Sequence, residues 1–339
     1  MQLVTINSNQ IAATKTAANL ETAAAHAAKA HAKNTNRSYQ NDLKLVSSYF
    51  PNFVNSTYQV ITPLTSTDVA AFLGHLISNG YTDKKGLTQQ YKPATLNRIN
   101  ATISSIHKAA NLDSPITKAV RAIIVGYGKT LTGGKAYQQK QAKALTNTTI
   151  TKAINKDAFD LTTKRGLRDK AIILVGFAAC LRRNEIASLK VSDLSFDKEG
   201  VNIVVVGGKT GTYKKYVPLA TDTDTCTVTA LKQWITAANL TKTDFLFCSI
   251  IKGDTITPSQ KIAGETVRKI AGETVRRILQ TTFGNEYTGH SLRVGFAVTA
   301  KTKGASVNDI QLAGGWRNAT MVNRYTEQVT AKQNAIKIF

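Results

Sequence analysis

A histidine and an arginine three residues apart, followed by a tryptophan and a tyrosine, form the most chemically suggestive pattern in the sequence. His290 and Arg293 would share one face of a helix, where both side chains can reach one anionic group. Trp316 follows a double glycine, and Tyr325 comes nine residues later. The combination suits phosphoryl transfer, because a phenol can act as a nucleophile and an arginine can stabilise charge on phosphate oxygens.

Breaking and rejoining a phosphodiester without a metal or cofactor requires a nucleophile, positive charge on the non-bridging oxygens, a proton acceptor and a proton donor. Tyr325 is the candidate nucleophile, because a phosphotyrosine link preserves the bond energy until a second hydroxyl attacks it. Most of the 11 tyrosines should be structural, and only its place after His290, Arg293 and Trp316 selects Tyr325. His290 is the candidate general base or proton relay for Tyr325, since an imidazole titrates near neutrality and His290 is the only histidine after His107.

Two arginines are candidates for holding the phosphate. Arg182 and Arg293 each present a planar set of donors that stays protonated and matches phosphate oxygens. Arg183 competes with its neighbour Arg182, but it should point about 100° away around a helix. Glu185 lies three residues after Arg182 and is a candidate for holding that arginine in place.

The hexapeptide LRRNEI around Arg182 and the later residues form an ordered series that is similar to the catalytic signature of the tyrosine recombinases, the phage integrase family. The series is Arg182, His290, Arg293, Trp316 and Tyr325. The resemblance implies a site-specific recombinase that acts through a 3′-phosphotyrosine intermediate and a Holliday junction, with no metal or cofactor. It also implies that Trp316, where many members have a histidine, packs against the site and donates its indole N–H to the phosphate. A buried core tryptophan is the alternative interpretation.

A glycine-rich segment, Gly207–Gly211, carries the candidate proton donor. Apolar stretches on both sides predict a β-hairpin with this segment at its tip. Lys209 matches the lysine of the family, which implies that it protonates the departing 5′-oxygen; Lys214 and Lys215 are alternatives. A Walker phosphate loop is rejected because its six-residue spacing is missing.

The resemblance also implies the architecture: a mainly α fold with a small antiparallel β-sheet in the catalytic domain, and two domains that form a C-shaped DNA clamp. We expect a flexible N-terminus over 1–20, a helical core-binding domain over 21–129, a linker over 130–145 and a catalytic domain over 146–339. The last five residues, AIKIF, are mostly apolar. By resemblance this tail docks on a neighbouring subunit of a homotetramer, and docking on its own domain is the alternative.

Apolar periodicity and capping residues predict the helices. In the first half they are a helix before Pro51, a second helix capped by Ser66 or Thr67 with Asp68, a third from Pro93, and a fourth from about Ser114. In the second half, segments around 148–154 and 163–180 are predicted to be helical. The longest apolar run, 171–181, is too short to span a bilayer and is predicted to be a buried helix.

The charge balance indicates a polyanionic partner. The chain carries 44 Lys and Arg against 21 Asp and Glu, a net charge of +23, and double-stranded DNA is the leading candidate. Residues 1–145 hold 16 basic against 5 acidic residues, and residues 146–339 hold 28 against 16, so both domains are expected to contact DNA. No segment suits a membrane. The family resemblance implies a target site with inverted-repeat arms.

Candidate DNA contacts are basic residues set apart from the apolar stripes. They are Arg37, Arg98, Lys108, Lys140, Lys143, Arg268, Lys269, Arg276 and Arg277. The last four lie in or beside a tandem repeat of KIAGETVR over 261–276, whose apolar residues permit one long helix. Entry of this helix into the major groove is the functional interpretation, and a local duplication that merely extends a helix is the alternative.

The three cysteines, Cys180, Cys226 and Cys248, are scattered and predict neither a disulfide framework nor a zinc site, which fits a reducing cytoplasm. The N-terminus lacks the features of a signal peptide. We therefore expect a cytoplasmic protein associated with DNA. Two other functions remain open: a type IB topoisomerase or telomere resolvase with the same residues, and a non-catalytic DNA-binding protein of the same fold.

Overall fold

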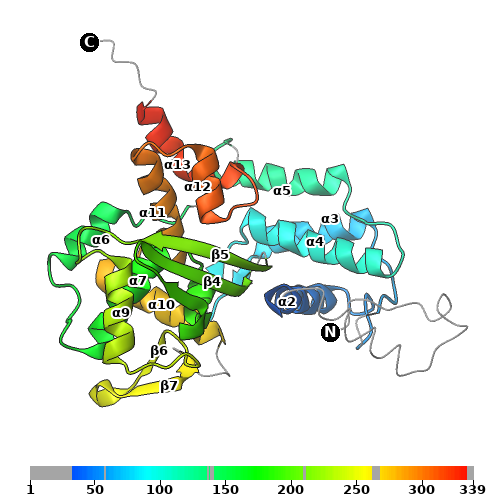
Figure 1. The fold of residues 1–339 in the computed structure, drawn as a ribbon. Coiled ribbons are helices and arrows are strands. Elements are labelled where there is room, and N and C mark those ends of the chain that lie inside the picture. Colours follow the sequence, from blue (N-terminus) through cyan, green and yellow to red (C-terminus); the bar gives the residue numbers. More distant parts are fainter. Residues whose placement is uncertain are drawn as a thin grey trace, which may run out of the picture. The chain divides into compact units, whose positions relative to one another are not determined.

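The computed structural model describes residues 33–56, 59–135, 137, 141–208, 211–261 and 268–333. The chain divides into two units, residues 1–140 and 141–339 (Figure 1). In the described ranges no helix is long and apolar enough to cross a membrane. The fold is mainly helical with small antiparallel sheets, as predicted.

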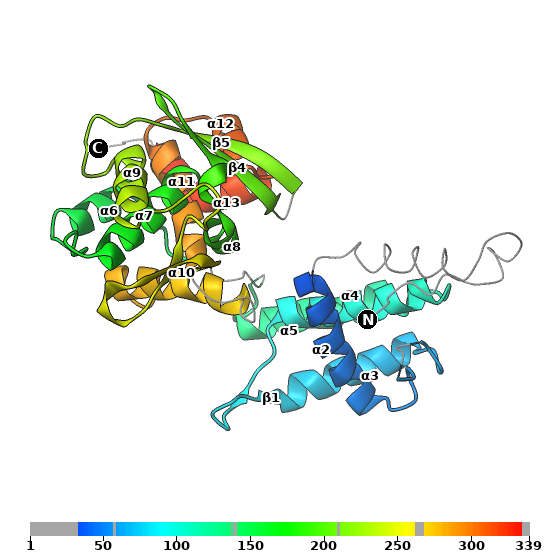
Figure 2. The same cartoon turned by 60° about the horizontal axis from the view of Figure 1, so that its bottom comes forward.

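The first unit packs its helices around one apolar core. Its elements are α2 (Lys33–Tyr49), α3 (Ser66–Asn79), α4 (Pro93–Ala109) and α5 (Lys118–Leu131), with a two-stranded ribbon of β1 (Tyr81–Thr82) and β2 (Thr88–Gln89) between α3 and α4 (Figure 2). The stripe predicted for α4 is buried, with Leu96, Ile99 and Ile103 fully inaccessible to solvent. His107 is buried as a packing residue, and its Nε2 accepts a hydrogen bond from the Leu64 amide at 3.1 Å.

Two helix starts in this unit differ from the prediction. Thr65, and not Ser66 or Thr67, caps α3, because only Thr65 has Asp68 at the third helical position and completes a reciprocal capping box. The helix expected from about Ser114 begins at Lys118, where Thr117 accepts a hydrogen bond from the Val120 amide. In both cases the capping hydroxyl that finds a backbone N–H sets the boundary.

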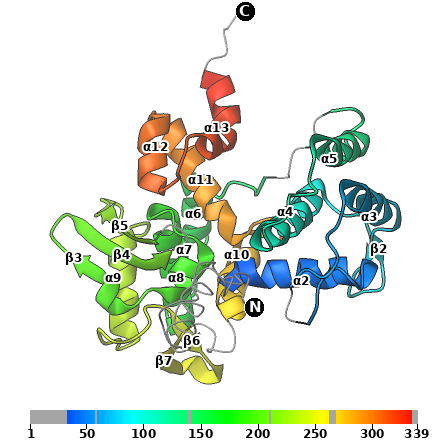
Figure 3. The ribbon, with the colours of Figure 1, turned by 90° about the vertical axis from the view of Figure 1, so that its right-hand side faces the viewer.

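The second unit packs its helices against one face of a three-stranded antiparallel sheet (Figures 1 and 3), while residues of the other face, such as Asn202, Val206 and Tyr216, are exposed. The sheet has the order β3 (Leu194–Phe196), β4 (Gly200–Gly208) and β5 (Gly211–Pro218). The predicted hairpin is confirmed, with Val201 opposite Val217, Ile203 opposite Lys215 and Val205 opposite Tyr213.

The helices of this unit carry most of the candidate site. They are α6 (Asn147–Ile154), α7 (Lys164–Ala178), α8 (Arg183–Ser188), α9 (Thr227–Ala237), α10 (Arg268–Phe283), α11 (Gly289–Thr302), α12 (Val307–Gly314) and α13 (Thr320–Gln333), with a second ribbon of β6 (Cys248–Ile250) and β7 (Ile256–Lys261). The predicted buried helix corresponds to α7, whose residues 171–175 are at most 4% exposed. Helix α10 takes up the second copy of the tandem repeat, whereas residues 262–267 of the first copy lie outside the described residues.

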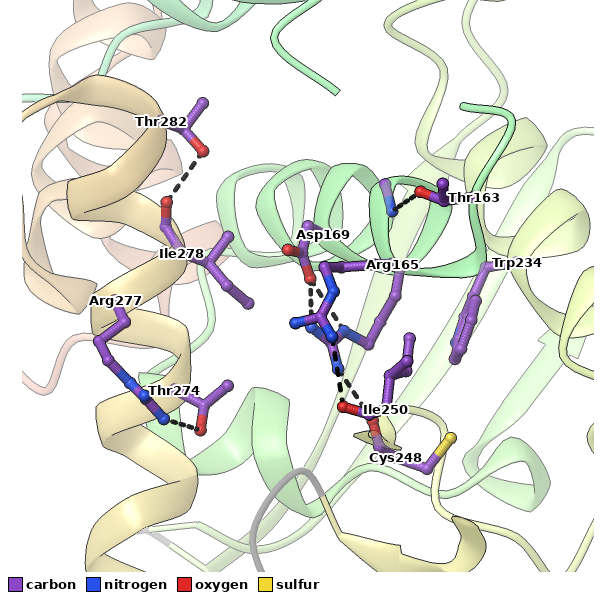
Figure 4. Close-up of polar contacts among 12 residues, drawn as sticks. Thr163, Arg165, Asp169, Trp234, Cys248, Ile250, Thr274, Arg277, Ile278 and Thr282 are labelled. Carbon is purple, nitrogen blue, oxygen red and sulfur yellow. Dashed lines mark hydrogen bonds and ion pairs between the residues drawn. The ribbon is translucent and has the colours of Figure 1, made fainter. Parts of the chain in front are cut away.

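Polar contacts fix the start of α7 against β6 (Figure 4). Thr163 caps the helix by accepting from the Gly166 amide at 3.0 Å, and the Arg165 guanidinium reaches the Ile250 carbonyl at 3.5 Å. Arg168 is held by Asp169 at 2.7 Å and donates to the Cys248 carbonyl at 3.3 Å. Helix α7 is therefore fixed both by these contacts at its start and by its buried residues. Its end leads directly to Arg182.

Candidate active site

His290 and Tyr325 meet across two helices of the second unit. The His290 Nε2 atom lies 2.6 Å from the Tyr325 hydroxyl oxygen, and their rings meet edge to face. His290 lies in the first turn of α11, where Thr288 caps the helix and the Ser291 hydroxyl accepts a hydrogen bond from the Thr288 amide. Tyr325 is only 5% exposed on α13, which packs along α11. The structure thus brings the candidate base and the candidate nucleophile into hydrogen-bond contact.

Arg293 lies one turn further along α11 and is almost completely buried, at 1% exposure. Its guanidinium donates to the Cys180 carbonyl and, at 3.2 Å, to the Gly314 carbonyl. It also lies 4.6 Å from the centre of the Trp316 ring, a cation–π contact. Arg293 therefore joins the segment before Arg182 to the segment before Trp316.

The double glycine before Trp316 has a steric explanation. A Cβ atom on Gly314 would lie 1.7 Å from the Trp316 Cζ3 atom, so the indole folds back over a position that only glycine can occupy. Gly315 has φ +66° and ends α12 in the left-handed conformation. These two glycines direct the indole towards the site, where its ring lies 5.9 Å from that of Tyr325, centre to centre.

Arg182 precedes α8 and is held by Glu185. The carboxylate accepts from the Arg182 backbone amide at 2.7 Å and from its guanidinium at 2.8 Å. The Glu185 side chain is 6% exposed, while that of Arg182 is 30% exposed. Arg182 is thus fixed from the buried side and keeps donors on an accessible side, whereas Arg183 packs against Gly289 and Gly272.

Burial and the nearby positive charges together shift the ionisation of His290 and Tyr325. Partial burial and the positive charges of Arg293 and Arg182 lower the pKa of His290. Burial raises the pKa of Tyr325, although Arg293 and Arg324 oppose the increase. At neutral pH an unprotonated imidazole therefore faces a protonated phenol, as general base catalysis requires.

Cys180 lies beside these groups but is unsuited to nucleophilic attack. Its side chain is fully buried, and burial raises the pKa of its thiol to about 11. A thiol that stays protonated at neutral pH is a poor nucleophile. Its backbone has φ +53°, a conformation that side-chain-bearing residues rarely adopt, and this aims its carbonyl at Arg293.

The three candidate proton donors, Lys209, Lys214 and Lys215, differ in their positions. Lys209 lies outside the described residues, between the ends of β4 and β5. Lys214 is exposed on β5. Lys215 points the other way, and its ammonium group donates to the Ala313 carbonyl at the end of α12.

The candidate DNA contacts of the first unit differ in their surroundings. Arg37 and Lys108 are exposed. Arg98 is paired with Asp42 at 2.6 Å, so part of its guanidinium serves the packing of α4 on α2. Lys140 lies outside the described residues.

In the second unit, Lys143 pairs with Glu286 at 3.0 Å. On α10, Arg276 pairs with Glu273, and the exposed Arg277 donates to Thr274 at 3.5 Å (Figure 4). The side chains of Arg268 and Lys269 are outside the described set, as is the apolar tail from residue 334.

The sequence did not indicate three residues near the site. Cys180 accepts from Arg293 through its backbone carbonyl, Tyr213 lies close to Glu185, and Lys215 faces the buried side of the sheet. The alternation Tyr213, Lys215, Val217 along β5 was the available signal, because alternate residues of a strand share one face. The Cys180 carbonyl left no signal in the sequence.

Comparisons with known proteins agree with this geometry. Residues 138–332 match the model of the phage integrase family. The chain is 28% identical to an integrase/recombinase xerD homolog of Selenomonas ruminantium, over 74% of this chain and 73% of the relative. It is 25% identical to recombinase Cre of Escherichia phage P1, over 50% of this chain and 52% of the relative.

Solved structures give the same fold. A site-specific recombinase, XerH, bound to palindromic difH substrate in a post-cleavage complex superposes with a TM-score of 0.60 and 20% identity, covering 97% of this chain and 86% of that one. A lambda integrase dimer bound to a core site gives 0.55 and 18% identity, over 92% of this chain and 77% of the other. The family match covers more than half of the chain, so the protein belongs to the phage integrase family of tyrosine recombinases, the enzymes of site-specific DNA recombination.

Proposed function

We propose that this recombinase cleaves and rejoins DNA through a 3′-phosphotyrosine intermediate on Tyr325, within a tetramer that passes through a Holliday junction. The 2.6 Å contact between His290 Nε2 and the Tyr325 hydroxyl carries the proposal. A DNA-binding protein without catalytic activity has no need for a buried phenol that meets a neutral imidazole among arginines.

In the cleavage step the Tyr325 oxygen attacks the scissile phosphorus, and its proton passes to His290 Nε2. The phosphorus–oxygen bond to the 5′-oxygen breaks as the new bond to Tyr325 forms. Arg182 and Arg293 stabilise the charge that develops on the non-bridging oxygens, and each keeps donors beyond those used by Glu185 or the carbonyls. Trp316, stacked on Arg293, supplies its indole N–H to the same phosphate.

The departing 5′-oxygen leaves with a proton from Lys209, which lies in the sequence between β4 and β5. In the reverse step, a 5′-hydroxyl of the partner strand attacks the phosphotyrosine while its proton passes to Lys209, and the proton held by His290 returns to the phenol. The phosphotyrosine keeps the bond energy, so no high-energy cofactor is needed, and the two arginines supply the positive charge that a metal would otherwise provide.

The assembly is part of the proposal. A recombinase in its family is described as bound to a palindromic substrate, and a palindrome presents two inverted arms to two identical subunits. We propose that the tail beyond residue 333 docks on the neighbouring subunit. The net charge of +23 supports extensive contact with phosphate.

The test is covalent trapping. Fragments bound by the protein are first selected from random duplex DNA, and the recovered site is then built with a nick beside the scissile phosphate. Wild type should form a protein–DNA band resistant to denaturation, and Tyr325→Phe should form none while still binding the site. Absence of the wild-type band, or its persistence in Tyr325→Phe, would refute the assignment.

A second assay separates recombination from topoisomerase or resolvase activity. Two recovered sites on one supercoiled plasmid should give rearranged products and junction intermediates. If the plasmid is only relaxed, or gains hairpin ends, and no strands are exchanged between the two sites, the activity is that of a topoisomerase or a resolvase and the recombinase proposal is wrong.

A further inference from the structure

We infer that Lys215 is a positioning residue that holds Trp316 and Arg293 in place from strand β5; this inference rests on the proposed function of the site. Lys215 points towards the buried side of the sheet, because its cross-strand partner is Ile203, which is fully buried. Its ammonium group reaches the end of α12 and donates to the Ala313 carbonyl.

The end of α12 is held by two cations on adjacent carbonyls. Lys215 donates to Ala313, and Arg293 donates to Gly314 at 3.2 Å. The last carbonyls of a helix lack partners within the helix and carry partial negative charge, so cations there satisfy and stabilise them. Trp316 lies two residues beyond Gly314, so a shift of this helix end would move the indole.

Two further groups lie close to the ammonium group of Lys215. Its Nζ atom lies 5.5 Å from the centre of the Tyr213 ring and 3.4 Å from where a Cβ on Gly315 would stand. Burial, with the nearby charges of Arg293 and Arg182 adding to it, lowers the pKa of this lysine. The contacts with the Ala313 carbonyl and the Tyr213 ring stabilise the charged form of Lys215 in this partly buried position.

A second residue on the same face of β5 lies close to the side chain that holds Arg182. Tyr213 lies two residues before Lys215 and close to Glu185, the carboxylate that holds Arg182; burial and this carboxylate raise the pKa of the Tyr213 phenol. Strand β5 therefore contacts residues that hold both of the proposed phosphate-binding arginines, Arg182 and Arg293. Strand β5 begins two residues after Lys209, so the proposed proton donor is close in the sequence to the strand that contacts these residues.

The test compares Lys215→Met with Lys232→Met, a matched control. Lys232 is an exposed lysine on α9 that also lies over an aromatic ring, Phe196 at 5.4 Å, but is not part of the site. The chain has two tryptophans, so fluorotryptophan labelling gives two fluorine NMR signals, and Trp316→Phe identifies the relevant one. The Trp316 signal should shift and broaden in Lys215→Met, stay unchanged in Lys232→Met, and return towards its original position in Lys215→Arg.

Cleavage gives the second readout. Lys215→Met should slow single-turnover formation of the covalent complex by about 10- to 100-fold, the loss expected from misplaced catalytic groups, with DNA affinity within about twofold of wild type. Lys215→Arg should recover much of the rate. If Lys215→Met fails to fold, Lys215→Gln takes its place with the same expected results.

An unchanged Trp316 signal in a folded Lys215 variant would overturn the inference, as would equal losses in Lys215→Met and Lys215→Arg. The NMR comparison needs no DNA. A failure of the proposed function, seen as no covalent complex with wild type, therefore remains distinct from a failure of the positioning role.

Discussion

The imidazole Nε2 of His290 and the phenolic oxygen of Tyr325 lie 2.6 Å apart, although 35 residues separate them in the sequence. In the neutral tautomer that carries its proton on Nδ1, the His290 Nε2 atom accepts the hydrogen bond that the phenol donates. Positive charge from Arg293 and Arg182 adds to partial burial in lowering the pKa of His290 below 6.5 and so favours this acceptor form. The chemistry of the site follows from that protonation state.

The first prediction concerns pH. The rate of covalent complex formation should be level from about pH 6.5 to 8 and fall only at lower pH, where His290 becomes protonated. Stability should change in the same direction. The unfolded chain binds this proton at higher pH than the folded chain, so stability is full above 6.5 and decreases as the pH falls towards the folded pKa.

His290→Gln is the control for that prediction. It should reduce the cleavage rate by about 10²- to 10⁴-fold, the usual contribution of a general base, and remove the acid limb of the profile. An acid limb that persists at the same pH in His290→Gln would mean that another group controls it.

The second prediction concerns Glu185, whose carboxylate accepts from both the backbone and the guanidinium of Arg182. Glu185→Gln should slow cleavage and destabilise the protein by about 1–3 kcal/mol, because a buried charged hydrogen bond is lost. Thermal unfolding and single-turnover cleavage measure the two effects. Glu199→Gln, at an exposed position in the turn before β4, should change neither.

The third prediction concerns Gly314. Gly314→Ala places a Cβ 1.7 Å from a Trp316 ring carbon, so the indole must move. Cleavage should fall by at least tenfold, and stability by about 1–3 kcal/mol, as for other overpacked positions. Gly74→Ala is the opposite case, since open space surrounds that helical glycine. It should stabilise the protein by about 0.5–1 kcal/mol, and a similar gain from Gly314→Ala would contradict the steric argument.

The fourth prediction concerns the backbone at Cys180, which has φ +53° and a buried side chain. Cys180→Val should destabilise the protein by about 2 kcal/mol or more, because a β-branched residue fits this conformation poorly. Its displaced carbonyl should also weaken the hold on Arg293 and slow cleavage. Cys180→Ala keeps the carbonyl in place and should cleave nearly as wild type does; equal effects of Val and Ala on cleavage would argue against a role for this backbone.

The proposed reacting residues could be chosen from the sequence because their types are few and their order is specific. One histidine follows His107, and one tyrosine follows Trp316, so His290 and Tyr325 could be chosen without coordinates. The mainly helical fold and the β4–β5 hairpin could also be predicted, since apolar periodicity and glycine-rich turns are local properties.

The residues that hold the reacting groups could not be found in this way. Cys180 contributes a carbonyl, which every residue has, and its contact with Arg293 spans 113 positions. Lys215 and Lys214 are indistinguishable by type, and only the strand register shows which one faces inward. Among equally plausible hydroxyls, Thr65 caps α3 because its geometry completes the box with Asp68.

The order of these contacts along the chain has a consequence during synthesis. A ribosome releases Arg182 first and Tyr325 last of the proposed reacting residues, and Arg293 finds its partners at Cys180 and Gly314 only after α12 has been made. Domains fold as they emerge, from the N-terminus onward. A nascent chain therefore gains much of its positive charge before the proposed nucleophile Tyr325 has been made, and we expect an unfinished copy to bind DNA without being able to cleave it.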